Sequence, residues 1–231
     1  MRKTVTSKQL RIQNPIRIAS LKTIQNEYER SLKEREGYKK VRWGSNQGMI
    51  NRFRLVRKFL SGIPYKTLLD IGCGTGDLFK VIKKRNKKYF AYDLNFRMVL
   101  CAKQNTNSAV HYFVASGDPI PLKANSLDVV TLIGVLQNCG VSIEKVIKEI
   151  QRVIKPGGYV FLITKNLAWE KFLRAEFSPE KEDNWFFDED INIPLRKYGF
   201  EIMQKGGFIN QSGRVTYMEK SHEIFYWIRK I

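Results

Sequence analysis

One ten-residue segment constrains the fold of this chain more than any other. Residues 68–77 read Leu-Leu-Asp-Ile-Gly-Cys-Gly-Thr-Gly-Asp, an apolar run that breaks into a glycine-rich turn. Leu68, Leu69 and Ile71 suit a strand that is covered on both faces. Alternate glycines allow a sharp turn and a close approach by a ligand, and the amides of a following helix attract polar groups. The segment predicts a strand, a ligand-binding turn and a helix.

A second apolar run, residues 89–92, ends in an acidic residue, Asp93. An acidic side chain at the tip of the second strand can accept hydrogen bonds from both ribose hydroxyls of an adenosine-containing ligand. A dinucleotide fingerprint, G-x-G-x-x-G, would place its third glycine at position 77, where this chain has Asp77. The pattern therefore argues against a nicotinamide dehydrogenase and leaves another adenosine-containing ligand.

The spacing Asp70-x-Gly72-x-Gly74-x-Gly76, followed by Asp93, resembles the motifs of class I S-adenosylmethionine-dependent methyltransferases. Three further segments follow in the order of that family, at residues 114–118, 127–138 and 153–162. The resemblance covers residues 60–165. It implies S-adenosyl-L-methionine as the cofactor and S-adenosyl-L-homocysteine as the product.

The resemblance also implies roles for particular residues. Asp70 would orient the glycine turn and the methionine amino group, Asp93 would bind the ribose, and Asp118 would meet the adenine. Met98 would pack on the adenine, and Arg42 could reach the cofactor carboxylate. The predicted cofactor-binding residues are Asp70, Gly72, Gly74, Asp93, Leu94, Met98, Gly117, Asp118, Ile133, Gly134 and Arg42.

Methyl transfer from a sulfonium is a one-step displacement that depends mainly on alignment of the reacting atoms and exclusion of water. We therefore assign no catalytic base, and expect His111 and His222 to be structural. Polar and aromatic residues after the fourth and fifth predicted strands, and two in the N-terminal region, are candidates for holding the acceptor. These predicted substrate-binding residues are Tyr38, Trp43, Gln137, Asn138, Lys165, Asn166 and Trp169.

The hydrophobic pattern predicts an α/β fold with a doubly wound, seven-stranded, mostly parallel sheet and an antiparallel last strand. Apolar positions at three- and four-residue spacing predict helices over 17–40 and 47–61. We expect an N-terminal helical cap at 1–60 and the cofactor-binding domain at 61–231. An aromatic-rich segment at 165–190 is expected to be a lid. A helix near 188–198 and strands at 200–205 and 223–229 complete the prediction.

Composition limits the class of protein. No apolar stretch approaches the roughly 20 residues that cross a bilayer, and the N-terminus lacks the apolar core of a secretory signal. Three cysteines without paired spacing favour a reducing compartment. With two histidines, a structural metal site is not expected. We predict a cytoplasmic, metal-free protein that has no membrane partner.

The net charge of +19 leaves the acceptor open. Lysines and arginines can bind nucleic-acid phosphates. The densest basic run, residues 83–88, is expected at the amino ends of the strands, away from the ligand crevice. We therefore predict a small-molecule acceptor, such as a biosynthetic-pathway intermediate, methylated at oxygen or nitrogen. An RNA methyltransferase and a non-catalytic S-adenosylmethionine-binding partner protein stay as alternatives.

Overall fold

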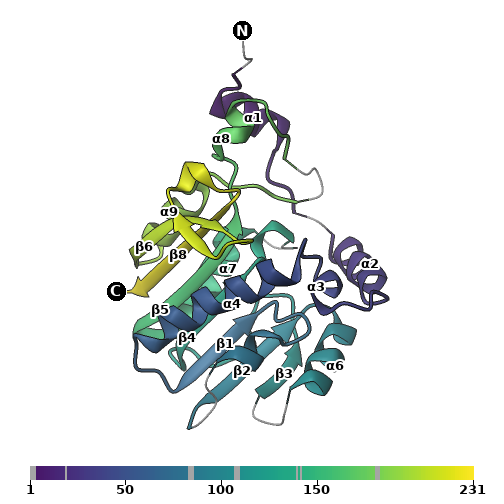
Figure 1. Cartoon of the computed structure of the whole chain (residues 1–231). Coiled ribbons are helices and arrows are strands. Elements are labelled where there is room, and N and C mark those ends of the chain that lie inside the picture. Colours follow the sequence, from purple (N-terminus) through teal and green to yellow (C-terminus); the bar gives the residue numbers. More distant parts are fainter. Residues whose placement is uncertain are drawn as a thin grey trace.

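The computed structural model describes residues 4–18, 20–82, 86–106, 110–138, 140, 142–179 and 183–231. Residues 83–85 of the basic run lie outside this range. The described residues form one sheet covered by helices on both faces (Figure 1).

The sheet has eight strands in the order β3-β2-β1-β4-β5-β8-β6-β7. The first five in that order are parallel, β8 runs antiparallel to β5, and β6 runs antiparallel to β8. This confirms the doubly wound, mostly parallel sheet with an antiparallel last strand. The strands are β1 (Thr67–Ile71), β2 (Lys88–Asp93), β3 (Val110–Val114), β4 (Leu127–Ile133), β5 (Ile154–Lys165), β6 (Phe200–Ile209), β7 (Arg214–Thr216) and β8 (Glu223–Lys230).

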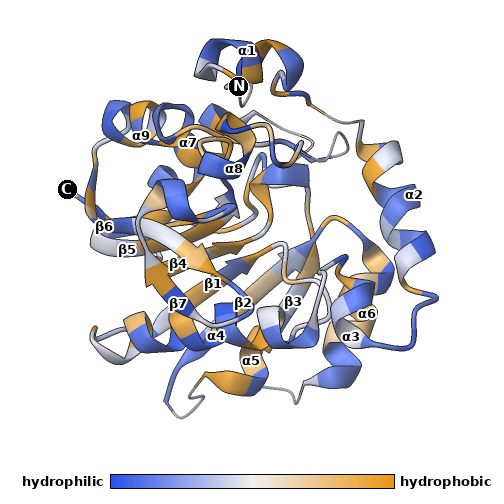
Figure 2. Cartoon of the chain, turned by 45° about the horizontal axis from the view of Figure 1, so that its top comes forward, coloured by the Kyte–Doolittle hydropathy of each residue, from blue (hydrophilic) through white to orange (hydrophobic). Residues whose placement is uncertain are grey.

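Helices bury the two faces of the sheet in separate apolar clusters. Leu68 and Leu69 of β1 belong to opposite clusters, because successive side chains of a strand point to opposite faces. On one face pack α4 (Asn46–Ser61) and α5 (Leu78–Val81), and on the other α7 (Ile143–Val153) and α9 (Asp188–Lys197). Figure 2 shows the hydrophobic strands enclosed by helices whose outer sides are hydrophilic. The remaining helices are α1 (Ser7–Gln13), α2 (Leu21–Ser31), α3 (Gly37–Lys40), α6 (Phe96–Asn105) and α8 (Glu170–Leu173), with 3₁₀ turns η1 (Leu136–Asn138) and η2 (Met218–Lys220).

Three sequence predictions need correction. The sheet has eight strands and not seven, because the short β7 pairs with the edge strand β6. The single helix predicted over 17–40 is two helices, since Ser20 caps the start of α2 and the chain turns before α3. The structure also has α1, capped by Thr6 and Gln9, which the sequence analysis did not predict. Within the described ranges, no helix is long and apolar enough to cross a membrane.

The N-terminal segment packs on the aromatic segment that follows β5. Leu10 of α1 is buried in a small cluster with Leu167, Phe172 and Trp185. The backbone amide of Val5 donates to the carbonyl of Leu173 at 2.8 Å. Figure 1 shows α1 beside α8, apart from the sheet. The N-terminal segment and the segment after β5, which are far apart in the sequence, thus pack together as one unit. We call this unit the joint cover.

We predict that Leu10→Asp separates these two segments, because it places a charge in a buried apolar cluster. Limited proteolysis should cut residues 4–18 and 166–187 several times faster in this variant, with the melting temperature of the sheet nearly unchanged. Ile12→Asp is the matched control, because Ile12 lies on the same helix and is 70% exposed. Equal cleavage of the two variants would contradict the joint cover.

Candidate active site

The carboxyl ends of β1, β2 and β4 converge at one edge of the sheet. The strand order reverses between β1 and β4, which is where α/β sheets open a ligand crevice. Gly72 follows β1 and Gly134 follows β4, with φ angles of 64° and 70°. Two small cavities lie at this edge, and a large chamber adjoins them.

The glycine turn has room for backbone alone. A Cβ on Gly72 would lie 2.6 Å from Val135 Cγ2, and one on Gly74 would lie 2.5 Å from Val41 Cγ1. Both glycines have positive φ, which side-chain-bearing residues rarely adopt. The turn is therefore a close-approach surface, as its sequence predicted.

Asp93 fastens this turn to the end of β2. One carboxylate oxygen accepts a hydrogen bond from the Gly74 amide and the other from the Asn95 amide, each at 2.9 Å. Burial raises the pKa of Asp93, and these backbone donors partly oppose that rise. The carboxylate lines both small cavities, where its remaining lone pairs can accept hydroxyl donors.

The two small cavities differ in their walls. The outer cavity, about 80 Å³, is lined by Leu94, Gly117 and residues of α2. The inner cavity, about 40 Å³, is lined by Asp70, Cys73, Gly74 and Ile133. Asp70 is buried and accepts a hydrogen bond from the Thr131 hydroxyl at 2.6 Å. Its burial raises the pKa of Asp70 to about 7.

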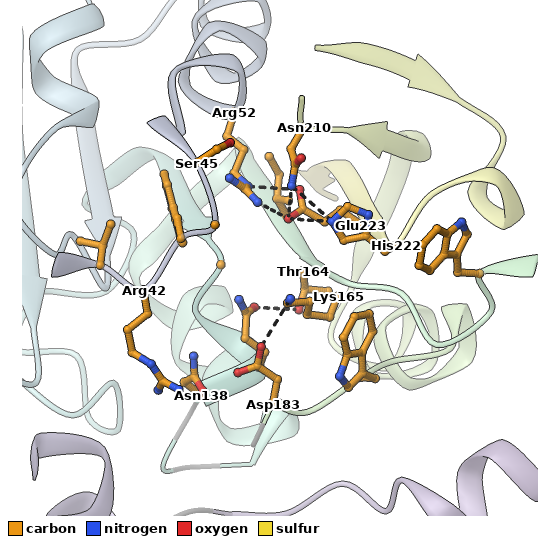
Figure 3. Close-up of a pocket in the computed structure, with 18 of the residues that line it drawn as sticks. Arg42, Ser45, Arg52, Asn138, Thr164, Lys165, Asp183, Asn210, His222 and Glu223 are labelled. Atoms are coloured by element: carbon orange, nitrogen blue, oxygen red, sulfur yellow. Dashed lines mark hydrogen bonds and ion pairs between the residues drawn. The ribbon is translucent and has the colours of Figure 1, made fainter. Parts of the chain in front are cut away.

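The chamber, drawn in Figure 3, has a volume of about 750 Å³. It shares lining residues with both small cavities. Gly134 and Tyr28 line all three spaces. Burial and the neighbouring Asp93 carboxylate raise the pKa of Tyr28, so its hydroxyl stays protonated at neutral pH. The described residues around the chamber are Tyr28, Val41, Arg42, Trp43, Gly44, Ser45, Arg52, Gly134, Gln137, Asn138, Ile163, Thr164, Lys165, Trp169, Phe172, Phe177, Ser178, Asp183, Trp185, Asn210, Gln211, His222 and Glu223.

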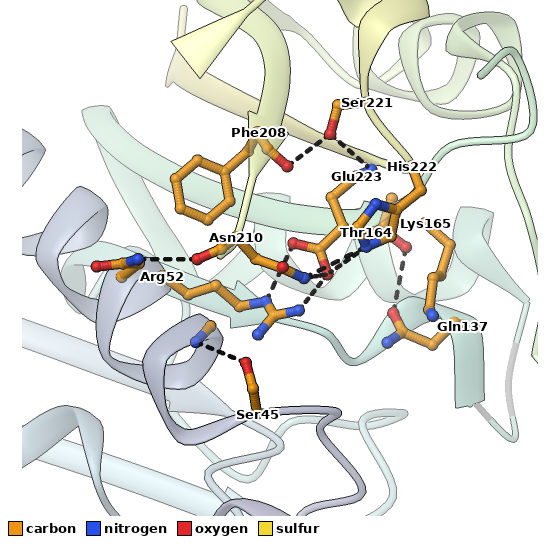
Figure 4. Close-up of polar contacts among 12 residues, drawn as sticks. Ser45, Arg52, Gln137, Thr164, Lys165, Phe208, Asn210, Ser221, His222 and Glu223 are labelled. Atoms are coloured by element: carbon orange, nitrogen blue, oxygen red, sulfur yellow. Dashed lines mark hydrogen bonds and ion pairs between the residues drawn. The ribbon is translucent and has the colours of Figure 1, made fainter. Parts of the chain in front are cut away.

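A buried polar network forms part of the chamber wall (Figure 4). Arg52 of α4 forms a two-pronged ion pair with Glu223, the first residue of β8, in which Arg52 Nε donates to Oε2 at 3.1 Å. Asn210 Nδ2 donates to Glu223 Oε1 at 3.2 Å and lies 3.3 Å from His222 Nε2. We call Arg52, Asn210, His222 and Glu223 the polar end.

The central part of this chain is similar in sequence to known proteins. A family profile described as "Methyltransferase domain" matches residues 69–162. This range contains the glycine turn, Asp93, the carboxyl ends of β1 to β4 and most of β5. The chain carries a class I S-adenosylmethionine-dependent methyltransferase domain. The resemblance seen in the sequence is thereby confirmed, and S-adenosylmethionine is the cofactor of this domain.

Individual relatives extend the methyltransferase match. A malonyl-[acyl-carrier protein] O-methyltransferase of Marinomonas sp. is 34% identical over 139 residues, which are 57% of this chain and 48% of that protein. A ubiquinone/menaquinone biosynthesis C-methyltransferase of Rickettsia akari is 28% identical and covers 82% of this chain and 83% of its own length. The chain spans about half the length of several curated relatives that it matches.

A solved structure from Thermotoga maritima confirms the fold. It is described as a S-adenosylmethionine-dependent methyltransferase and possible histamine N-methyltransferase. It aligns with a TM-score of 0.63 at 19% identity, over 90% of this chain and 100% of that one. At this identity the match shows the shared architecture and does not identify an acceptor.

Most of the predicted cofactor-binding residues come together in the methyltransferase domain. The two small cavities are lined by Asp70, Gly72, Gly74, Asp93, Leu94, Gly117, Ile133 and Gly134. A groove with a close-approach turn, an acceptor carboxylate at Asp93 and an apolar outer wall fits the cofactor. The cofactor supplies an electrophilic methyl group on a positively charged sulfur.

Three predicted cofactor contacts lie elsewhere. Met98 lies in the first turn of α6 on its inner side and is fully buried, and its amide donates to the side chain of Asn95, which caps the helix. Asp118 lies 3.3 Å from Lys145 and outside the lining of the outer cavity. Arg42 pairs with Glu27 and lines the chamber, so it does not reach the inner cavity.

Of the predicted substrate-binding residues, five line the chamber and two do not. The chamber is lined by Trp43, Gln137, Asn138, Lys165 and Trp169. Asn166 is fully buried and donates to the carbonyls of Met218 and Ser221, so it is structural. Tyr38 packs on the apolar cluster around α4, outside the chamber lining.

Sequence analysis missed Tyr28 and the whole polar end. Tyr28 falls within the helix predicted over 17–40, and no local motif marks it as a cavity residue. His222 was expected to be structural, yet it lines the chamber with a side chain that is 24% exposed. Arg52 and Glu223 meet across 171 positions, a pairing without a local signal.

We predict that Gly72→Ala lowers the affinity for S-adenosylmethionine by more than about tenfold. The new Cβ would meet Val135 and force a residue into a positive φ. Calorimetric titration of the folded variant measures the change. Gly37→Ala is the matched control, because a Cβ there meets no heavy atom within 4 Å. Unchanged binding by Gly72→Ala would contradict the close-approach assignment.

The raised pKa of Asp70 predicts a pH-dependent stability. The folded state holds the proton up to pH about 7, whereas an unfolded aspartate releases it near the ordinary value of 3.8. The folded state therefore binds more protons between these values, and the free energy of unfolding falls as the pH rises through them. Asp70→Asn, which cannot ionise, should be more stable than the parent at pH 8 by up to about 4 kcal/mol.

Urea unfolding of both proteins at pH 5 and pH 8 tests this dependence. The advantage of Asp70→Asn should be larger at pH 8. Asp128→Asn is a control of opposite sign: burial alone would raise the pKa of Asp128, but Lys155 and two backbone amides lower it to about 2. That variant should lose stability equally at both pH values. If the difference in the free energy of unfolding between Asp70→Asn and the parent were the same at both pH values, the raised pKa of Asp70 would be contradicted.

Proposed function

We propose that this protein transfers the methyl group of S-adenosylmethionine to an oxygen or nitrogen atom of a small-molecule acceptor bound in the chamber. One observation carries the proposal: Gly134 and Tyr28 line the chamber and both cofactor cavities. An acceptor in the chamber would therefore lie next to the cofactor. A volume of about 750 Å³ is also in the range of small-molecule sites.

The residues of this chain would act by positioning. Asp93 would accept hydrogen bonds from ribose hydroxyls, and the turn at Gly72 would admit the cofactor closely. Tyr28 and Trp43 would shield the reacting atoms from water, which favours displacement at carbon. We assign no proton acceptor at the reaction centre, since the nucleophile itself is not identified.

The origin of the residues that enclose the chamber supports the division into a predicted cap and a predicted lid. Tyr28 and Trp43 come from the proposed cap, residues 1–60, while Trp169, Phe177 and Trp185 come from the proposed lid, residues 165–190. We propose that both segments select the acceptor, with residues 61–231 holding the cofactor. A cytoplasmic location is also proposed, since Cys73 and Cys101 are free thiols.

An RNA acceptor is the competing proposal, and the net charge of +19 favours it. The cations at the chamber wall have carboxylate neighbours: Arg52 has Glu223, Lys165 has Asp183, and Arg42 has Glu27. Such pairs are weak sites for a phosphate backbone. RNA binding that falls steeply with salt concentration would favour the RNA proposal instead.

Asp93→Ala should weaken binding of S-adenosylmethionine and S-adenosylhomocysteine more than about tenfold, because it removes two charge-assisted hydrogen bonds of roughly 1.5–3 kcal/mol each. Calorimetry measures the dissociation constants. Glu29→Ala is the control, because Glu29 is a carboxylate on α2 that contacts Asn95 and Arg97 without lining the cofactor cavities. No binding by the parent protein would refute the proposed function. Binding without turnover of any acceptor would favour the non-catalytic alternative.

A further inference from the structure

The lining of the chamber indicates a chemical class of acceptor. We infer that the acceptor is an uncharged, polyhydroxylated molecule of the carbohydrate class, methylated on a hydroxyl oxygen. This inference rests on the proposed function and names its substrate. Three features of the described lining support it: few aliphatic side chains, cancelled charges, and aromatic walls that alternate with hydrogen-bonding groups.

Aliphatic surface is scarce in the chamber. Of its described lining residues, only Val41 and Ile163 have aliphatic side chains. A site for a long acyl or isoprenoid chain needs extensive apolar surface, because burial of that surface drives the binding. The described lining offers little of it, so a lipid-like acceptor does not fit.

The charges of the chamber cancel in pairs. Arg52 and Glu223 are buried together, with side chains 8% and 6% exposed. Lys165 Nζ lies 3.5 Å from Asp183 Oδ2, and Arg42 pairs with Glu27 at the chamber rim. An anionic acceptor would approach Glu223 and Asp183, and a cationic acceptor would approach Arg52 and Lys165. Removing an ion from water requires an unmatched partner of opposite charge, so this balance favours a neutral molecule.

Aromatic rings supply the apolar part of the walls. Trp43, Trp169 and Trp185 line the chamber together with Tyr28, Phe172 and Phe177. The face of an aromatic ring is electronegative and attracts weakly positive C–H groups. One face of a sugar ring presents such C–H groups, whereas its edge presents hydroxyls. Aromatic rings beside polar side chains in the lining match that division.

The polar end is built to meet hydroxyl groups. Its ion pair and the Asn210 hydrogen bond hold each group in place, so donors and acceptors lie at fixed positions. Asn210 is 8% exposed, and its Oδ1 has no hydrogen-bond partner among the described residues. A hydroxyl both donates and accepts, so it can pair with the amide and carboxylate groups that line this part of the chamber.

The chemical step for a hydroxyl acceptor is balanced. The hydroxyl oxygen forms a bond to the methyl carbon as the carbon–sulfur bond breaks, and the electron pair of that bond stays on sulfur. The hydroxyl proton leaves to water. The products are a methyl ether and S-adenosylhomocysteine, and no oxidant or reductant is needed.

The experiment measures S-adenosylhomocysteine formation by the full chain with three panels of acceptors. The first holds neutral methyl glycosides of hexoses, 6-deoxyhexoses and pentoses. The second holds catechol and hydroquinone, and the third malonate and sugar phosphates. Turnover above the acceptor-free rate is expected with neutral glycosides only. Turnover of phenols or acids instead, or no glycoside turnover by a protein that binds S-adenosylmethionine, would overturn the inference.

These outcomes separate the two proposals. Methylation of a phenol would agree with the proposed function and contradict the carbohydrate inference. A failure to bind S-adenosylmethionine would contradict both.

Trp169 provides the matching variant test with the glycoside that turns over. Trp169→Leu should raise the KM for the glycoside about tenfold, with kcat and the Kd for S-adenosylmethionine unchanged, and Trp169→Phe should restore most of the affinity. Tyr217→Leu is the control, since Tyr217 is 76% exposed and lies outside the chamber lining. An unchanged KM in Trp169→Leu would contradict the stacking role.

Discussion

The hydrogen bond from the Gly74 amide to the Asp93 carboxylate is the contact on which the site depends. It joins the turn after β1 to the tip of β2, two elements that the parallel sheet already places side by side. With the turn fixed, Gly72 and Gly74 can keep positive φ angles against Val135 and Val41. The same carboxylate faces the cofactor cavities, so one group both builds the groove and offers it an acceptor.

A second level of organisation lies above the sheet. The methyltransferase domain presents its strand ends, and segments from both termini enclose the space above them. The N-terminal region contributes α2 and Trp43, while the chain after β5 contributes the aromatic residues and the polar end. Residues of the N-terminal region line both the cofactor cavities and the chamber, whereas the residues after β5 line only the chamber among these three spaces. Such a division is common in folds that host many reactions, because loops can change while the sheet stays the same.

The sequence predicted best those features that local chemistry determines. Buried strands have near-continuous apolar runs, and the turn needs glycines at fixed positions, so β1, β2, Gly72 and Asp93 could be recognised directly. Features that distant packing decides could not be predicted in the same way. Met98 is fully buried within α6, Asp118 lies 3.3 Å from Lys145, and the three-residue β7 pairs with the edge strand β6. The polar end could not be found at all, because Arg52 and Glu223 become neighbours only after the sheet has formed.

The position of Tyr28 has a consequence for how the two compartments depend on each other. Its ring is a shared wall between the cofactor cavities and the chamber, and it is carried by α2, which covers the outer cavity. A substitution of Tyr28 or a displacement of α2 would therefore alter the walls of both compartments at once. Binding in one compartment is thus expected to respond to a structural change in the other.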